Sequence, residues 1–521
     1  MTQASPPTSH QRSSHLPIIL LLVVLLAVGL LSFRDYGLSW DEPLFYDYGK
    51  ASQYAYSISA RLNGTFDLNK SLGASAGDHV TRGPAYLLIG GLIEGLLEKA
   101  GLDLASAWHL TNFLTYLVGL IFFHLLARTW LEPVPATIST AFFATQPVLW
   151  NHAFINPKDS AFAIFFLITM YLSLRMIDKW DGNAKKILLS TILPGILLGI
   201  TSAIRFLGPY AVLLVFIYFL SKPNKKSIWW GFIPYGLLAL ATMLALWPFL
   251  WSDPINQFVF VLKSMSDTSA NLKTLFMGRE YHGYELPRRY FPILLTSTLT
   301  EPTWPLFLAG LLTAIYSSFN KRVDRTKLTT IFLWFGFVIT TLIALNPPNS
   351  DGYRHYLFIL PPVFLFAGIG INEILKRIRA RWMRYGLIAL ILLPAIINNI
   401  TLHPYQYTYY NTFVGGTQNA FREYETDYWL TCYKEVMENF NEEAPLNANI
   451  YIKREPYIAA YYAREDISVF DFRTDFKSAR MGEYLLVNSR TNEDQKTLKG
   501  APVILEVGRQ GAVFCVIKLI P

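Results

Sequence analysis

The sequence LPIILLLVVLLAVGLLSF, from Leu16 to Phe33, contains no charged residue and decides the fold class. The run is long enough to cross the hydrocarbon core of a bilayer as a helix. A small-x-small triplet lies inside the run, at Ala27-Val28-Gly29, so the sequence favours a retained membrane anchor over a cleaved signal peptide. Two adjacent carboxylates, Asp41 and Glu42, follow close to the expected membrane surface.

The composition of the whole chain agrees with a membrane protein. Of 521 residues, 52% are hydrophobic and 16% are charged, whereas soluble domains average about 25% charged residues. The net charge of +8 does not indicate nucleic-acid binding, because Lys and Arg gather in short loops between apolar runs. Two cysteines, Cys432 and Cys515, are too few for a disulfide framework or a thiolate metal site, but one disulfide between them is possible.

Further apolar runs predict more membrane-spanning helices. They are Ala107–Leu126, Val134–Leu149, Ala161–Ile177, Ile187–Ala203, Leu207–Leu220, Ile228–Leu250, Ile293–Ser317, Leu328–Leu345, Tyr356–Ile371 and Tyr385–Ile400. With the N-terminus inside, the basic loops 179–186, 222–226, 321–327 and 376–384 all fall on the inner side. The predicted fold class is a polytopic α-helical membrane protein with about eleven transmembrane helices over residues 16–400, after a disordered cytoplasmic segment 1–15.

The predicted outer side carries a long first loop, residues 34–106, and a soluble tail, residues 401–521. Within the loop, Ala85–Leu97 is apolar but short and carries Glu94, so we interpret it as an interfacial or re-entrant helix. The tail contains short β-branched or aromatic runs and predicts a small external α/β domain. Its expected strands are Asn449–Lys453, Ile467–Phe470, Tyr484–Asn488, Val503–Val507 and Val513–Ile517, the last two joined by a turn at Gly508–Gly511.

Ionisable residues gather in the predicted outer loops, several of them where a loop meets a span. Placing such residues at membrane depth is costly, so they are candidates for function. The candidate site residues are Asp41, Glu42, His79, Arg82, His152, Lys158, Asp159, Arg205, Arg354 and His355.

Several of these candidates also have a purely structural interpretation. Asp41 and Glu42, before a proline, could cap a helix, and Asp159 could be an acid favoured by a helix dipole. Lys158 is opposed by the same dipole, and a bound phosphate would satisfy both the lysine and the free helix amides. Arg205 could extend to the membrane interface or form a phosphate-binding fork.

A divalent metal is a further possibility for this group of residues. His79 and His152, together with Asp41 or Asp159, could supply ligands, although no spacing in the sequence requires it.

The order and sidedness of the motifs resemble the GT-C superfamily of glycosyltransferases, polytopic enzymes that use lipid-phosphate-linked sugars as donors. Within it, the chain is most similar to family 39, which includes dolichyl-phosphate-mannose protein mannosyltransferases and the lipid A aminoarabinose transferase. The resemblance covers about residues 16–430. The matching stretches are Trp40-Asp41-Glu42, Arg82-Gly83-Pro84-Ala85-Tyr86, Asn156-Pro157-Lys158-Asp159, Asp351-Gly352-Tyr353-Arg354-His355-Tyr356 and, as in a bacterial branch, His403-Pro404-Tyr405-Gln406 and Glu425-Thr426-Asp427-Tyr428-Trp429.

The resemblance implies a mannosyltransferase-like hexosyltransferase of the cell envelope, active on the external side of a bacterial inner membrane. Its partners would be a polyprenyl-phosphate-linked sugar and a protein, lipid or glycan acceptor, as in protein glycosylation. It implies Asp41 as general base and Glu42 as a supporting acid. Donor-phosphate contacts would be Lys158, Arg205, Arg354 and Arg82, with His79, His152, Asp159 and His355 as further site candidates.

The chemistry of such a donor predicts direct displacement with inversion. A sugar on a phosphate monoester already has a good leaving group, so the acceptor hydroxyl is the partner that needs help from a base, worth roughly 10²–10⁴-fold in rate. Two other functions are alternatives to this enzyme. A transporter or flippase of lipid-linked sugars would need polar residues near mid-membrane, and a membrane-anchored sensor would leave the Asp-Glu pair unexplained.

Overall fold

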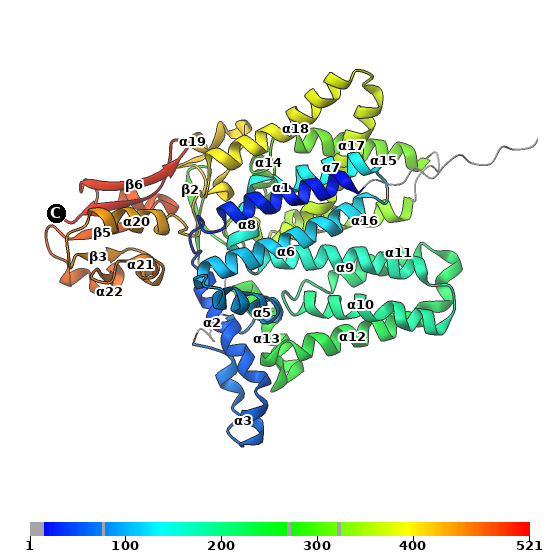
Figure 1. Cartoon of the computed structure of the whole chain (residues 1–521), viewed down its shortest axis with the longest axis horizontal. Helices are drawn as coiled ribbons and strands as arrows, with labels where there is room; N and C mark the ends of the chain where they lie inside the picture. Colours follow the sequence, from blue (N-terminus) through cyan, green and yellow to red (C-terminus); the bar gives the residue numbers. More distant parts are fainter. Residues whose placement is uncertain (1–14, 75–78, 268–271, 320–324) are drawn as a thin grey trace, which may run out of the picture.

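The computed structural model describes residues 15–74, 79–267, 272–319 and 325–521. Most of the predicted disordered N-terminus (1–14) and part of one basic loop (320–324, with Lys321 and Arg322) lie outside the described residues. The molecule has two parts: a bundle of long helices, and a sheet domain at one end of it (Figure 1).

The bundle contains the helices that follow the apolar runs of the sequence. They are α1 (Leu16–Ser32), α6 (Leu104–Ala127), α7 (Pro133–Ala144), α8 (Pro147–Ile155), α9 (Asp159–Lys179), α10 (Ala184–Ser202), α11 (Tyr210–Leu220), α12 (Phe232–Ala245), α14 (Tyr290–Ser297), α15 (Thr303–Phe319), α16 (Arg325–Leu345), α17 (Leu360–Arg377) and α18 (Arg381–Thr401).

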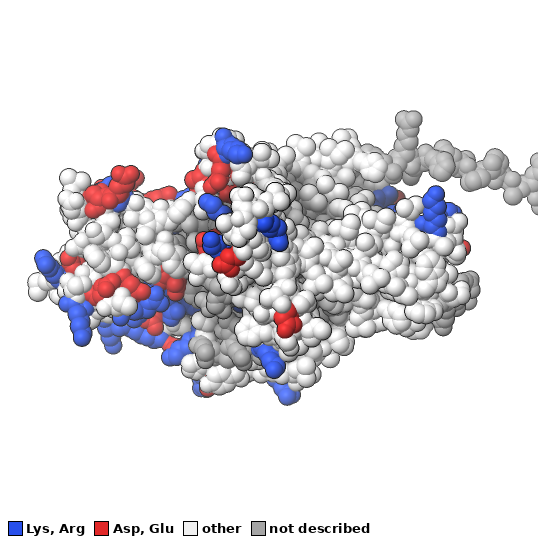
Figure 2. All heavy atoms as spheres, turned by 90° about the horizontal axis from the view of Figure 1, so that it is seen from below, with Lys and Arg blue, Asp and Glu red and all other residues white. Residues whose placement is uncertain are grey.

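Seven helical stretches among the described residues are long and apolar enough to span a membrane. They comprise α6, α9, α10, α16, α18 and the stretches Ser227–Ala245 and Arg354–Arg377, which contain α12 and α17. Helices α1, α11 and α15 are apolar but shorter. The face of the bundle in Figure 2 is almost free of charged atoms, whereas they crowd the sheet domain and the layer beside it. The chain is an integral membrane protein with a helical membrane part.

Three predicted spans are not continuous helices, and the prediction was wrong there. One of them, Ile228–Leu250, is helical only as far as Ala245, because Trp247 before Pro248 leaves the helical conformation. The run Val134–Leu149 is divided into α7 and α8, because Pro147 has no N–H to donate and holds Gln146 in an extended conformation. The run Ile293–Ser317 is divided into α14 and α15 by residues 298–302, which include Pro302.

Helix α9 lies at the centre of the bundle and α18 at its edge. The apolar window of α9 is 83% buried, against 11% for α18. Helices α6, α10 and α11 pack on α9, while α15 packs on α17. Helices α15 and α17 approach each other closely because Gly310 of α15 has no side chain. A Cβ atom at that position would collide with the Phe366 carbonyl oxygen. Because α9 is packed on several sides, its first residues are held in a fixed position at the sheet-domain end of the bundle.

The long loop after α1 folds into short helices beside the sheet-domain end of the bundle (Figure 1). They are α2 (Glu42–Gln53), α3 (Ile58–Leu62) and α5 (Ala85–Lys99). Helix α5 covers the run predicted as interfacial or re-entrant. A second long connection contains α13 (Pro254–Asp267) and a small hairpin, β1 (Lys273–Phe276) with β2 (Arg279–His282), which the sequence analysis did not predict.

The C-terminal domain has a five-stranded mixed sheet in the order β4-β3-β5-β7-β6. The strands are β3 (Asn449–Ile452), β4 (Ser468–Asp471), β5 (Tyr484–Asn488), β6 (Val503–Arg509) and β7 (Ala512–Leu519), which confirms the five predicted positions. The β6–β7 turn places Gln510 and Gly511 at positive φ, as a tight hairpin requires. Helices α20 (Tyr433–Glu443), α21 (Pro456–Tyr462), α22 (Phe472–Asp475) and α23 (Glu493–Lys496) accompany the sheet.

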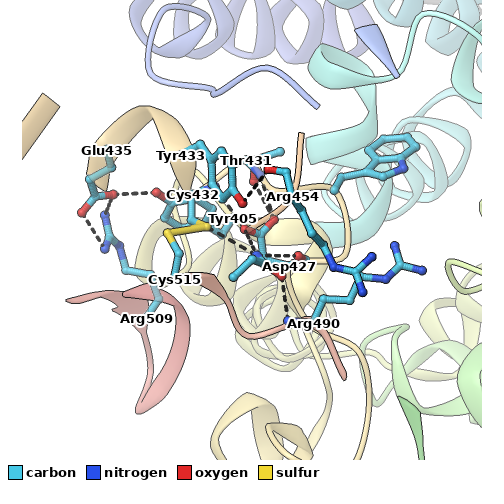
Figure 3. The surroundings of a disulfide bond; sticks show 12 residues. Tyr405, Asp427, Thr431, Cys432, Tyr433, Glu435, Arg454, Arg490, Arg509 and Cys515 are labelled. Carbon is cyan, nitrogen blue, oxygen red and sulfur yellow. Dashed lines mark hydrogen bonds and ion pairs between the residues drawn. A yellow bond between two sulfur atoms is a disulfide. The ribbon is translucent and has the colours of Figure 1, made fainter. Parts of the chain in front are cut away.

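The segment between α18 and the sheet is fixed by polar and covalent contacts (Figure 3). A disulfide joins Cys432, before α20, to Cys515 of β7, with the two Cα atoms 6.1 Å apart. The Asp427 carboxylate accepts hydrogen bonds from the backbone N–H groups of Thr431 and Cys432, both at 3.0 Å. These contacts fix the conformation of residues 427–432 and join Cys432 to the sheet.

Candidate active site

Asp41 directly precedes α2, but its side chain does not cap that helix. Its backbone is already helical, with φ −79° and ψ −28°, and the carboxylate makes no capping hydrogen bond. It lies instead 3.3 Å from Nη1 of Arg354 and is 24% exposed. Helix capping therefore does not account for Asp41.

Glu42 lies beside Asp41 in the chain but points elsewhere. Its buried carboxylate accepts hydrogen bonds from the Ser39 N–H at 2.6 Å and the Tyr46 hydroxyl at 2.5 Å. The Nε2 atom of His109 lies 3.2 Å away. These contacts fix the start of α2, and with it the backbone that carries Asp41.

Arg354 is the centre of the charged cluster. Its guanidinium donates to Asp41, to Asp159 at 3.0 Å and to Asp351 at 3.0 Å. It also lies over the ring of Trp429, 4.8 Å from the centroid. One buried cation therefore joins the loop after α1, the start of α9 and the loop before α17.

Asp159, at the start of α9, binds a second arginine, Arg205, beside Arg354. Asn156 accepts hydrogen bonds from the backbone N–H of Asp159 at 2.7 Å and of Lys158 at 3.2 Å. This turn directs the Asp159 carboxylate to Arg205, with which it forms an ion pair. Arg205 in turn donates to Nδ1 of His355 at 2.9 Å, so that this nitrogen carries no proton.

A close backbone approach completes the cluster. Gly83 packs against the Ala203 carbonyl oxygen, where a Cβ would collide with it, and the Ala85 N–H donates to that same oxygen at 3.2 Å. The contact holds the segment containing His79 and Arg82 next to Arg205.

These residues surround a cavity of about 340 Å³ at the sheet-domain end of the bundle. Of the ten predicted site residues, seven line it: Asp41, His79, Arg82, Lys158, Arg205, Arg354 and His355. Asp159 lies behind the wall and pairs with two of the arginines. Glu42 and His152 do not line this cavity; His152 faces a separate space of about 30 Å³ and contacts the Tyr428 hydroxyl at 3.3 Å.

The cavity wall is rich in cations. Arg82, Lys158, Arg205 and Arg354 contribute positive charge, and Lys158 also lies over the ring of Phe45 at 5.0 Å. Burial, together with the neighbouring arginines, lowers the pKa of Lys158 well below its ordinary value. An anion in the cavity would favour the charged form of that lysine, so the wall is suited to a phosphate group.

Asp41 is the carboxylate that faces this positive wall. Burial alone would raise the pKa of Asp41, but the electrostatic effects of Arg354, Lys158, His79 and Arg82 together outweigh it and lower the pKa. Asp41 is therefore ionised at neutral pH and able to accept a proton.

The metal hypothesis does not fit the residues that the structure describes. Nowhere in residues 15–74, 79–267, 272–319 and 325–521 do three His, Cys, Asp or Glu side chains gather as a metal site would require. His79 and His152 face different spaces, and Asp41 and Asp159 are both paired with arginines.

The sheet domain supplies residues that the sequence analysis missed. Glu455 and Tyr457, at the start of α21, line the cavity, and the Tyr457 hydroxyl donates to the Trp40 carbonyl oxygen at 2.6 Å. Nothing in the local sequence marks them, because only the folding of the tail over the bundle brings them to Asp41.

Arg490, after β5, connects the sheet domain to the residues behind the cavity wall. Its Nη2 lies 2.7 Å from Oδ1 of Asp351, whose other oxygen accepts from Arg354. Its guanidinium also lies 4.7 Å from the ring centroid of Trp40. Arg490, Asp351 and Arg354 thus form a buried chain of charges from the sheet domain to Asp41.

Comparison with solved structures bears on this arrangement. ArnT from Cupriavidus metallidurans, crystallised with undecaprenyl phosphate, superposes with a TM-score of 0.50 at 12% sequence identity, covering 96% of this chain and 97% of ArnT. Its apo state gives the same score at 13% identity. The chain shares the fold of ArnT.

A second protein of known structure shares the fold, and sequence comparison adds nothing further. The apo Archaeoglobus fulgidus oligosaccharyltransferase also superposes with a TM-score of 0.50, at 11% identity over 92% of this chain and 70% of its own. No protein-family model and no curated protein matches the sequence. At these identities the likeness extends to the fold, and the site residues have to be argued from their own geometry.

Proposed function

We propose that the protein is a membrane glycosyltransferase that moves a sugar from a polyprenyl-phosphate carrier to an acceptor hydroxyl. The observation that carries the proposal is the cavity in which ionised Asp41 faces Arg82, Lys158, Arg205 and Arg354. A carboxylate base and an anion-binding wall are the two elements that this transfer needs. ArnT, which shares the fold, was crystallised with undecaprenyl phosphate.

The reaction is a direct displacement at the anomeric carbon. The acceptor oxygen forms the new bond to that carbon while the bond to the phosphate oxygen breaks. Asp41 takes the hydroxyl proton, and the polyprenyl phosphate leaves with the bonding electron pair. Attack opposite the leaving group inverts the configuration.

The cations have two roles in this step. Arg82, Lys158 and Arg205 hold the phosphate and stabilise the charge that develops on it. Arg354 connects the phosphate end of the cavity to the base. When the phosphate draws Arg354 and Lys158 toward itself, less positive charge remains beside the Asp41 carboxylate. The pKa of Asp41 then rises, and Asp41 becomes a stronger base.

The membrane arrangement follows from the donor. The lipid tail would lie against the apolar wall near Phe206 and Leu207, which line the cavity. We place this end of the bundle on the external face of a bacterial inner membrane, with about eleven passes counting the shorter and broken helices. The sheet domain then covers the acceptor entrance through Glu455 and Tyr457.

The test is chemical conversion of a defined donor. Purified protein would be incubated with a short-chain polyprenyl phosphate carrying a radiolabelled sugar, and free polyprenyl phosphate would be measured. Release above the rate of a protein-free control supports transfer, which occurs slowly to water when the acceptor is missing. A flippase would leave the donor intact and move it across proteoliposomes, and that result would reject the enzyme.

A further inference from the structure

A second large cavity, of about 460 Å³, lies at the end of the bundle opposite the sheet domain. It is formed where the C-terminal ends of α6 and α9 meet the first turn of α16 (Figure 1). It has no part in the transfer site described above. Its lining combines basic side chains with leucines.

The lining carries a clear excess of positive charge. Arg128, Arg175, Lys179 and Lys327 all line the cavity, and Asp178 is the acid among its lining residues. Asp178 is already engaged, since it accepts from Nζ of Lys327 at 2.7 Å and from the Tyr218 hydroxyl at 2.5 Å.

The remaining three cations have no acidic neighbour of this kind. Within the part of the chain that the structure describes, no carboxylate lies within 4.0 Å of Arg128, Arg175 or Lys179. The Arg175 guanidinium donates instead to the Tyr171 hydroxyl, at 3.1 Å. Arg175 and Lys179 are also one helical turn apart, where like charges repel.

The general preference of basic residues for one side of a membrane protein does not explain this arrangement. The positive-inside rule and helix dipoles favour cations at this end of a bundle, but they do not require three helices to direct them into one hollow. Convergence of cations on a concave site is what anion binding requires.

The apolar part of the surroundings indicates what kind of anion fits. Val118, Ile121 and Leu125 follow one another at helical spacing on α6 and are 45%, 41% and 37% exposed. They form an apolar strip that begins at the cavity, since Leu125 lines it, and runs along the bundle. A charged head and an apolar tail would be accommodated together.

We propose that this cavity binds the phosphate group of an anionic lipid from the leaflet opposite the transfer site. On the orientation proposed above this is the cytoplasmic leaflet. The lipid would neutralise Arg128, Arg175 and Lys179 and join the ends of α6, α9 and α16. Binding here is independent of sugar transfer, so the two proposals can fail separately.

The experiment counts lipids on the intact protein in detergent. Native mass spectrometry would follow titration with phosphatidylglycerol and, in parallel, with phosphatidylcholine, for the wild type and for R175Q/K179Q. Phosphatidylglycerol should bind to the wild type in preference to phosphatidylcholine, and the double variant should lose about tenfold or more of that affinity. K376Q/R379Q, which removes two exposed charges from another loop at this end, should bind as the wild type does.

Three further results complete the test. R175K/K179R, which keeps the charges, should retain binding, so that loss in the first variant is not misfolding. Equal binding of both lipids, or equal loss in K376Q/R379Q, would overturn the proposal. Displacement of the lipid by millimolar inorganic phosphate would reject the lipid as occupant and assign the site to the free ion.

Discussion

Asp41 owes its charge to the residues around the cavity and not to its place in the chain. Arg354 comes from the loop before α17, Lys158 from the start of α9 and Arg82 from the loop before α5. All of them lower the pKa of Asp41 against the effect of burial. The base and the anion-binding wall are therefore one electrostatic unit, and a change in either should alter the other.

Lys158→Gln tests the anion-binding wall. The substitution removes a buried ammonium group that faces the cavity, so the donor KM should rise and kcat/KM should fall by roughly tenfold to a hundredfold. Steady-state kinetics with the synthetic donor would measure this. Lys50→Gln, an exposed lysine on α2, is the matched control and should change neither constant. An unchanged donor KM in Lys158→Gln would exclude the lysine from donor binding.

Glu425 gives a prediction about pH. Burial is the main cause that raises the pKa of Glu425 to about 7; Arg490 opposes the shift and Asp351 adds to it. Between pH 4.5 and 7 the folded protein keeps a proton that the unfolded chain has released, so the free energy of unfolding falls as pH rises through this window. Thermal unfolding should show a lower Tm at about pH 8 than at about pH 5.

Glu425→Gln mimics the protonated carboxyl and should flatten that pH dependence. Its Tm should equal that of the wild type near pH 5 and exceed it near pH 8. Parallel curves for both proteins would show that another group controls the stability.

Among the elements, the segment from His79 to the start of α5 depends on one close contact. Gly83→Ala would place a methyl group against the Ala203 carbonyl oxygen. We expect a loss of about 1–3 kcal/mol in stability and a drop in transfer activity, because Arg82 moves away from Arg205. Gly95→Ala, in α5, meets open space, so it should raise stability by up to about 1 kcal/mol and leave activity unchanged. Equal effects of the two substitutions would refute the role of the contact.

The elements also show what the sequence could and could not predict. The five strands of the tail were predicted because β-branched and aromatic runs are separated by turn residues. The break between α7 and α8 was not predicted because the apolar run continues through Pro147. A proline inside an apolar run does indicate a possible break in the helix. Seven of the ten candidate residues, chosen because they lie in loops at the ends of spans, line one cavity, and their roles there stay predictions.

The differences between the predicted and the observed site residues have one physical origin. Adjacent residues such as Asp41 and Glu42 point in different directions once α2 begins. Arg490, Glu455 and Tyr457 reach the cavity only through the tertiary fold of a domain far along the chain. Neither fact is encoded in a local pattern.

For the whole molecule, the chain Arg490–Asp351–Arg354 links the sheet domain to the base. Arg490→Gln should lower kcat by about 10–100-fold, as is typical when a partner that orients a site group is lost, while donor KM changes little. Arg490→Lys should recover part of the rate. Arg422→Gln breaks an ion pair with Asp494 inside the sheet domain and is the control. A rise in donor KM with kcat unchanged would contradict a positioning role.

The most direct test of the whole account compares Asp41→Asn with the wild type on a bound donor. Donor binding, measured by isothermal titration, should persist, and release of polyprenyl phosphate should fall by roughly 10²–10⁴-fold. Glu98→Gln, an exposed carboxyl substitution on α5, should leave both unchanged. Release by Asp41→Asn at the wild-type rate would contradict Asp41 as the base and, with it, the proposed mechanism.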